Sequence, residues 1–127
     1  MRSLAGIALR DGRVFVARRK PGGDMGLKWE FPGGKAEPGE DDQRTLAREW
    51  DEEFGTAARA LRPLGASGFE HGGRRYELAA WLIELDGEPS ELREHVEAAW
   101  VGRDRLESLD LADSDRSLLP FVLPLLR

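Results

Sequence analysis

Three glutamates near the middle of the chain are spaced so that they meet on one side of a helix. Glu49, Glu52 and Glu53 stand at i, i+3 and i+4, and such positions share one helix face. Gly55 follows, and glycine ends helices readily in the left-handed conformation. The carboxylates would therefore crowd the last turn, where the helix dipole disfavours each anion by about 0.3–1 kcal/mol. Because a solvated structural helix would carry Lys or Arg there, we interpret the cluster as a site that expects a cation.

The glutamates belong to a longer pattern of glycine, arginine and glutamate. It runs Gly34-x5-Glu40-x7-Arg48-Glu49-x2-Glu52-Glu53-x-Gly55. Seven fixed residues at ordinary usage match by chance about once in 10⁸ start positions. The pattern resembles the Nudix box, the signature of the Nudix hydrolases. The stretch from Trp29 to Glu40 is similar to the MutT-type branch of that family.

The resemblance implies an enzyme that uses Mg²⁺, with Mn²⁺ as a substitute, to cleave a nucleoside diphosphate linked to another group. For a MutT-type chain it implies that a metal-activated water attacks an NTP or dNTP, intact or oxidised, and gives NMP and pyrophosphate. Two alternatives stay open. One is hydrolysis of CTP or of a nucleoside-diphosphate conjugate such as ADP-ribose. The other is a nucleotide sensor without hydrolysis, although such sensors usually lose carboxylates of the box, and here all are present.

Oxygen atoms are the ligands that Mg²⁺ prefers, and it commonly keeps waters and phosphate oxygens beside a few protein ligands. The resemblance implies that Glu49, Glu52 and Glu53 bind the metal and that the backbone carbonyl of Gly33 is a further ligand. It also implies that Arg48 orients the carboxylates. The number of metal ions stays open.

A second titratable pair, Glu94 and His95, precedes the last predicted strand by a few residues. In many MutT-like chains the Glu of such a pair is a further metal ligand or the general base. Whether Glu53 or Glu94 is the base stays open. His95 is a candidate for proton transfer, but a loop histidine is more often a structural contact.

Basic residues near the box are candidates for phosphate contacts. Lys35 directly follows two glycines, where backbone N–H groups can approach anions closely. Arg18 and Arg19 are adjacent, so on a strand they face opposite sides, and the register against MutT-type chains favours Arg19. Arg74 aligns with another substrate contact of such chains, with an ordinary edge-strand charge as the alternative.

The base is expected to meet an aromatic ring and an acidic side chain. Trp29 and Phe31 alternate with Glu30, so one ring could stack on a base while the other fills the core. Asp115 falls where MutT-type enzymes place an Asn or Asp that reads the base edge, and Asp113 is the alternative. Because the chain contains no Asn, readout of 8-oxoguanine by Asn is impossible. The preferred base and sugar therefore stay open.

Hydrophobic periodicity and turn residues predict the elements that must position these side chains. The Asp-Gly at positions 11 and 12 predicts a hairpin. Asp41 is a good N-cap for a helix that ends at about Phe54. The predicted strands are 3–10, 13–19, 28–31, 58–68, 74–85 and 98–101, with loops at 20–26 and 33–39 and a short or kinked helix near 114–126. This order suits an α/β (α+β) fold. The resemblance implies a Nudix α/β/α sandwich with a mixed central β-sheet, as one domain over residues 1–127.

Composition bounds the remaining possibilities. A net charge of −5 argues against a general nucleic-acid or membrane-surface binder. Residues 1–30 hold seven basic and three acidic side chains, whereas residues 35–53 hold three basic and eight acidic ones, as a metal–polyphosphate substrate would require. There are no cysteines, so disulfides are excluded. Without a signal-peptide pattern or a membrane-length apolar run, we expect a cytoplasmic protein, monomer or homodimer, whose partner is a small nucleotide.

Overall fold

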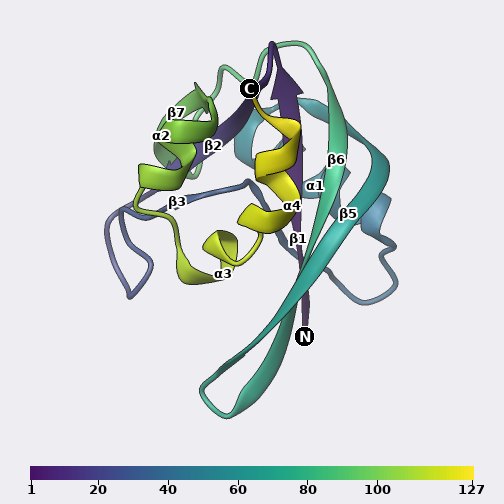
Figure 1. The fold of residues 1–127 in the computed structure, drawn as a ribbon. Helices are drawn as coiled ribbons and strands as arrows, with labels where there is room; N and C mark the ends of the chain where they lie inside the picture. Colours follow the sequence, from purple (N-terminus) through teal and green to yellow (C-terminus); the bar gives the residue numbers. More distant parts are fainter.

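In the computed structural model, which describes residues 1–127, a mixed β-sheet lies between helix α1 on one face and the C-terminal helices on the other (Figure 1). The strands are β1 (Arg2–Arg10), β2 (Arg13–Arg19), β3 (Trp29–Glu30), β4 (Gly33–Lys35), β5 (Ala57–His71), β6 (Arg74–Asp86) and β7 (His95–Val101). The helices are α1 (Asp42–Phe54), α2 (Arg103–Ser108), α3 (Asp113–Arg116), α4 (Leu119–Val122) and the 3₁₀ turn η1 (Leu123–Leu125). The strand order is β3-β2-β1-β6-β5, with β4 beside β1 and β7 beside β2. Only the β1–β6 pairing is parallel, so the predicted mixed sheet is confirmed.

Two hydrophobic cores lie on opposite faces of the sheet. On one face, α1 packs through Leu46, Trp50 and Phe54, which are fully or almost fully buried, and the rings of Trp50 and Phe54 contact Phe15 of β2. On the other face, side chains from α2, α4 and the segments beside them cover the sheet, and they include Leu106, Leu111, Leu118 and Val122. The predicted stripe of α1 is confirmed, and the layers are helix, sheet and helix.

Local capping residues set the ends of α1 as the sequence predicts. The Asp41 side chain accepts a hydrogen bond from the Arg44 N–H at 2.8 Å, which satisfies one free donor of the first turn. Gly55 adopts a left-handed conformation with φ of 64°, and its N–H donates to the Asp51 carbonyl. No basic residue stands in the last turn of α1.

The predicted loop over residues 33–39 is wrong at its start, because Gly33–Lys35 forms strand β4. β2 pairs with β1 only through Leu9 and Arg10, which leaves the first half of β1 with a free edge that β4 fills. A Cβ atom on Gly33 would lie 2.0 Å from the Leu4 carbonyl oxygen. Glycine is therefore required for this close approach.

The short or kinked helix predicted near residues 114–126 is divided into three short helical pieces in the structure. Pro120 lies in the first turn of α4 and Pro124 in the first turn of η1. Proline lacks an N–H and fits only the start of a helix, so each proline begins a new piece. Helix α2 was not predicted, and β7 begins at His95, three residues before the predicted start at 98.

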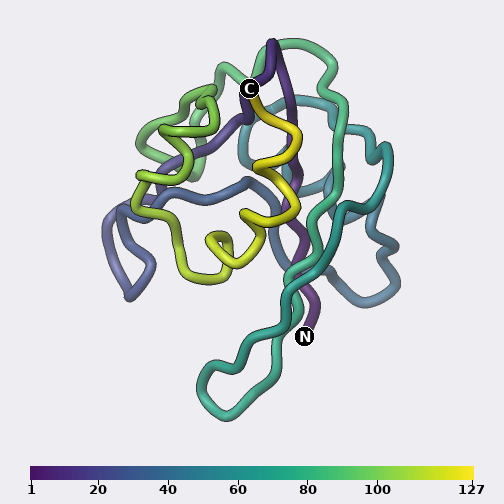
Figure 2. The backbone as a smooth tube through the Cα atoms, viewed as in Figure 1, coloured from purple at the N-terminus to yellow at the C-terminus, as the bar shows by residue number.

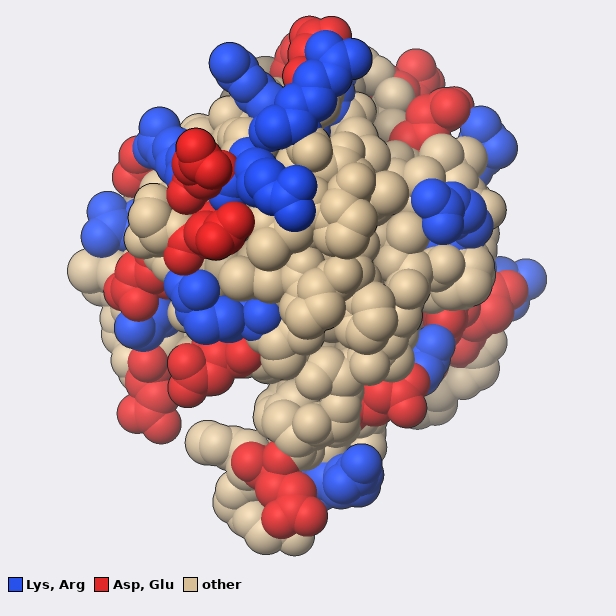
Figure 3. All heavy atoms as spheres, in the orientation of Figure 1, with Lys and Arg blue, Asp and Glu red and all other residues tan.

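The β5–β6 hairpin extends beyond the body of the molecule, as the teal projection in Figure 2 shows. Its turn contains Gly72 and Gly73, both with positive φ. Over the face drawn in Figure 3, Lys and Arg side chains are interspersed with Asp and Glu instead of forming one basic surface. None of the helices combines the length and apolar character that crossing a membrane requires.

Candidate active site

A charged cavity of about 450 Å³ lies beside the C-terminal end of α1. No hydrophobic residue lines it; the lining residues are Arg19, Lys20, Pro21, Gly22, Glu30, Glu49, Glu52, Glu53, Glu94 and His95. They come from the end of β2 and the following loop, from β3, from α1 and from the start of β7. The structure thus brings five of the residues predicted for the site into one cavity: Arg19, Glu49, Glu52, Glu53 and Glu94.

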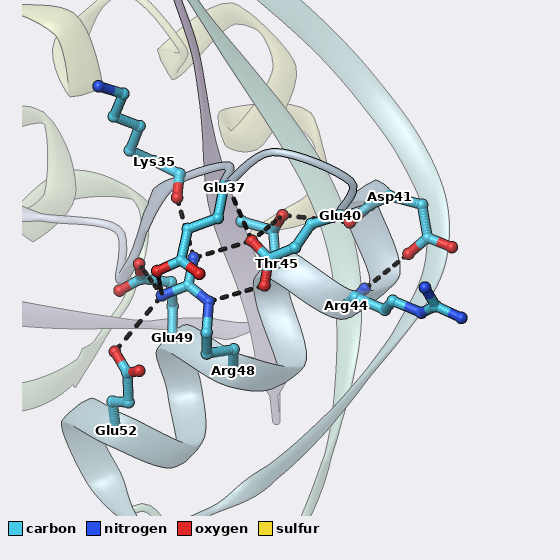
Figure 4. Close-up of polar contacts among 9 residues, drawn as sticks. All are labelled: Lys35, Glu37, Glu40, Asp41, Arg44, Thr45, Arg48, Glu49 and Glu52. Carbon is cyan, nitrogen blue, oxygen red and sulfur yellow. Dashed lines mark hydrogen bonds and ion pairs between the residues drawn. The ribbon is translucent and has the colours of Figure 1, made fainter.

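Arg48 holds the carboxylates of α1 in place (Figure 4). Its Nη1 donates to Glu49 Oε1 at 2.8 Å and to Glu52 Oε2 at 3.4 Å. Its Nε and Nη2 donate to the two oxygens of Glu40 at 2.7 and 2.9 Å, and Nη2 also donates to the Lys35 carbonyl at 3.0 Å. One guanidinium therefore joins the loop before α1 to two carboxylates at the far end of the helix. This geometry supports the orienting role predicted for Arg48.

Glu40 connects the loop to the helix and does not line the charged cavity. It accepts hydrogen bonds from Arg48, from the Glu37 N–H at 2.9 Å and from the Thr45 hydroxyl at 3.1 Å. These donors, Arg48 first, lower the pKa of Glu40 to about 2. The same contacts raise the pKa of Arg48. Glu40 therefore stays ionised over any working pH.

Glu53 is the most enclosed carboxylate of the cavity. Its side chain is 9% exposed, and its Oε2 atom is buried without a hydrogen-bond partner. Burial, reinforced by the charges of Glu30 and Glu49, raises the pKa of Glu53 to about 9. Burial also raises the pKa of Glu49. A buried carboxylate oxygen with nothing to neutralise it is a site that a divalent cation fits.

Glu30 and His95 complete the buried acidic end of the cavity. Glu30 accepts from Arg19 Nη1 at 2.9 Å, and its other oxygen lies 2.8 Å from His95 Nε2. The His95 ring is buried and stacks on Phe54 with a centroid distance of 5.3 Å. One ligand atom each from Glu30, Glu53 and His95 lies within 4.8 Å of the other two. These three side chains form the most compact group of potential metal ligands.

Glu30 was not predicted from the sequence to be a member of the site. Trp29 and Phe31 are both buried, at 7% and 2% exposure. Side chains alternate along a strand, so Glu30 has to face the opposite side, toward β7. That alternation was visible in the sequence. The pairing of β2 with both β3 and β7, which brings Glu30 to His95, was not.

A second cavity of about 210 Å³ adjoins the first, and Arg19 and Glu53 line both. Phe31, Gly33 and Asp115 line the second cavity, whereas Trp29 does not. Asp115 accepts from the Phe31 N–H at 2.9 Å, and its other oxygen accepts from the Ser114 hydroxyl at 3.3 Å. Burial, and then the charge of Glu30, raises the pKa of Asp115 to about 7. The residues predicted to meet the base therefore lie together.

A third cavity, of about 590 Å³, lies between the loop after β2, the β5–β6 hairpin and α3, and Arg19 lines it too. Phe69 and Tyr76 form part of its wall, with their rings stacked at a centroid distance of 5.3 Å. Neither ring could be recognised as part of a site from the sequence. Only the pairing of β5 with β6 places them opposite each other.

Two of the predicted phosphate contacts lie away from these cavities. Lys35 is exposed, and its side chain points away from the carboxylates (Figure 4). Arg74 is exposed at the tip of the β5–β6 hairpin, where it pairs with His71. Neither residue lines any of the three cavities. Phosphate contact by Lys35 or Arg74 stays a prediction.

The raised pKa of Glu53 predicts how the stability of the metal-free protein depends on pH. Between about 4.5 and about 9, the folded state keeps a proton on Glu53 that the unfolded chain has lost. Stability should therefore fall as pH rises through this window. Glu53→Gln removes the effect, so the variant should melt near the wild-type temperature at pH 5 and several degrees above it at pH 9.

Thermal melts in EDTA at several pH values measure this difference. Asp115 titrates in both proteins, so subtracting the two curves isolates Glu53. A variant that melts well below the wild type at pH 9 would contradict the description of Glu53 as a buried carboxylate with an unpartnered oxygen.

Comparisons with known proteins give a consistent result. Residues 2–122 match the family model described as the NUDIX domain. The chain is 33% identical over 116 residues to a CTP pyrophosphohydrolase of Escherichia coli, covering 91% of this chain and 86% of that one. It is 32% identical over 114 residues to a putative 8-oxo-dGTP diphosphatase 2 of Mycobacterium tuberculosis, covering 89% and 81%. The crystal structure of a MutT NUDIX hydrolase from Burkholderia pseudomallei superposes with a TM-score of 0.82 at 27% identity, covering 95% of this chain and 96% of that one.

Proposed function

The chain belongs to the NUDIX family and is a Nudix hydrolase, and from this premise we propose that it cleaves an NTP or dNTP to NMP and pyrophosphate, with Mg²⁺ as its cofactor. The observation that carries the proposal is the charged cavity at the end of α1. Glu49, Glu52 and Glu53 line it together with Glu94, and Arg19 and Lys20 line it as well. Acidic groups for a metal and basic groups for phosphates thus share one cavity, as phosphoryl transfer requires.

The residues of the cavity have different proposed roles, which follow from their positions. Glu49, Glu52, Glu53 and Glu94 would hold the metal, with the Gly33 carbonyl as a further ligand. Bound there, the metal would neutralise phosphate charge and make an attacking water more acidic. Arg48 keeps the carboxylates oriented, and Glu53 or Glu94 takes the proton of the attacking water. Arg19 stands where the three cavities meet, a position from which one cation can contact phosphates while the base lies further along.

The identity of the base depends on what Asp115 can accept. One of its oxygens is taken by the Phe31 N–H, and the other has only the longer contact to Ser114. A free carboxylate lone pair accepts from an exocyclic amine. Cytosine, adenine and guanine carry such an amine, whereas uracil and thymine do not. The contact separates CTP from UTP but not from adenine or guanine nucleotides, and the similarity to a CTP pyrophosphohydrolase makes CTP the second candidate substrate.

Replacing Asp115 by Asn tests the readout without disturbing the fold. The Asn carbonyl oxygen can still accept from the Phe31 N–H, and its NH₂ group replaces an acceptor by a donor. The ratio of kcat/KM between CTP and nucleotides whose base offers an acceptor should shift by about tenfold or more, since a base contact is worth about 1–3 kcal/mol. Steady-state kinetics on CTP, UTP, dGTP and 8-oxo-dGTP measure the ratios. Equal scaling of every substrate would show that Asp115 is only structural.

A substrate panel with Mg²⁺ tests the proposed function itself. The panel holds all NTPs and dNTPs, 8-oxo-dGTP, ADP-ribose and sugar nucleotides, with chromatographic detection of the NMP. We expect one or more triphosphates to be hydrolysed best. Preference for ADP-ribose or a sugar nucleotide would move the assignment to a conjugate hydrolase. Binding of nucleotides without turnover of any would support a sensor.

A further inference from the structure

The C-terminal end of α1 receives its cation from another part of the chain. The last turn contains no basic residue. Arg93, which lies just before β7, donates from Nη1 to the Asp51 carbonyl at 3.0 Å. Its backbone N–H donates to the Glu53 carbonyl at 3.1 Å. Arg93 therefore satisfies the free carbonyl of Glu53, adds a second donor to the Asp51 carbonyl that Gly55 already contacts, and places a positive charge at the negative end of the dipole.

Gly55 makes room for this contact. A Cβ atom at Gly55 would lie 2.8 Å from Arg93 Nη2 and 3.0 Å from Glu91 Oε2. Glu91 in turn accepts from Arg93 Nε at 2.8 Å and holds the guanidinium in its orientation. The glycine thus serves both the left-handed conformation and the approach of the guanidinium.

The backbone carbonyl of Arg93 also makes a hydrogen bond, to a segment other than α1. Its carbonyl accepts from Lys20 Nζ at 3.0 Å, which links it to the loop after β2. The next residue, Glu94, lines the charged cavity with Glu52, Glu53 and Lys20. Contacts through the N–H, the carbonyl and the side chain of Arg93 therefore hold together three segments that line the cavity.

We propose that Arg93 is a positioning residue that fixes Glu94 against the carboxylates of α1 and so sets the affinity of the site for a divalent cation. The inference rests on the proposed function, because it takes the metal to lie at this end of α1. Glu94 lies in an exposed stretch of chain. Without the bonds from Arg93 to α1, its carboxylate would be free to move away from Glu52 and Glu53, and one ligand would be lost for part of the time.

Direct Mn²⁺ binding to the full chain, followed by electron paramagnetic resonance, tests this without substrate. Arg93→Ala should raise the dissociation constant for Mn²⁺ by about 10–100-fold, the usual effect of losing support for a metal ligand. Arg93→Lys keeps a charged donor near the Asp51 carbonyl and should stay within about threefold of wild type. Arg59→Ala is the matched control, because Arg59 is an exposed arginine that pairs only with Glu84 on the sheet edge. It should leave Mn²⁺ binding unchanged.

A double substitution shows whether Arg93 acts through Glu94. Glu94→Gln alone should weaken Mn²⁺ binding, and adding Arg93→Ala should then weaken it less than about twofold further. The inference would be overturned if the effects of the two substitutions on the Mn²⁺ dissociation constant multiply. It would also be overturned by an Arg93→Ala protein that binds Mn²⁺ like the wild type, or by an Arg93→Lys protein as weak as Arg93→Ala. If the folded wild type itself binds no Mn²⁺, the metal site of the proposed function is wrong and the inference about Arg93 fails with it. If the wild type binds Mn²⁺ and Arg93→Ala binds it equally well, only the inference about Arg93 fails.

Discussion

Glu53→Gln is expected to lower kcat by at least about a hundredfold, or about 2.7 kcal/mol in the barrier, while the protein stays folded. Gln has the volume of Glu without its charge. Glu53 is the buried carboxylate whose Oε2 has no partner, and it lies near Glu30 and His95. Kinetics at saturating Mg²⁺, together with circular dichroism, measure the effect.

Asp51→Asn is the matched control, because Asp51 is an exposed carboxylate on the same turns of α1 that does not line the cavity. It should keep kcat within about threefold of wild type, less than ~0.7 kcal/mol in the barrier. A Glu53→Gln protein that also stays within threefold would remove Glu53 from the metal site.

Arg48→Ala is expected to lower kcat/KM by about 10–100-fold and to raise the Mg²⁺ concentration needed for half-maximal rate. The guanidinium is the only group that contacts Glu40, Glu49 and Glu52 together, so its loss lets the carboxylates spread. Arg48→Lys should recover only part of the loss, because an ammonium group cannot reproduce the forked contact to Glu40. Mg²⁺ titrations of the initial rate separate the two effects.

Arg44→Ala provides the control on the same helix. The Arg44 side chain points to solvent, and only its backbone N–H takes part in the cap with Asp41 (Figure 4). The Mg²⁺ concentration that the Arg44→Ala variant needs for half-maximal rate should match that of the wild type. If Arg48→Ala also shows an unchanged Mg²⁺ requirement, then Arg48 has only a structural role in joining the loop to α1.

Features set by local physics could be predicted from the sequence. The ends of α1 follow from a capping Asp41 and a left-handed Gly55, and the predicted strand 13–19 has the observed bounds of β2. The family resemblance and the carboxylate spacing placed Glu49, Glu52 and Glu53, and all three line one cavity with Glu94.

Features set by long-range pairing could not be predicted. β4 exists because the first half of β1 has a free edge, and nothing near Gly33 reveals this. Glu30 meets His95 only because β2 pairs with β3 and β7. Arg93 contacts the end of α1 from a segment some 40 residues later in the chain. Hydrophobic periodicity predicts where the helix lies but does not predict which distant residue contacts its end.

The most direct test of the account identifies the products from CTP, or from the best triphosphate of the panel, with Mg²⁺ and with EDTA. We expect NMP and pyrophosphate in equal amounts with Mg²⁺, and neither product in EDTA. Formation of a nucleoside diphosphate and inorganic phosphate, or equal turnover in EDTA, would contradict a metal-dependent pyrophosphohydrolase built on the carboxylates of α1.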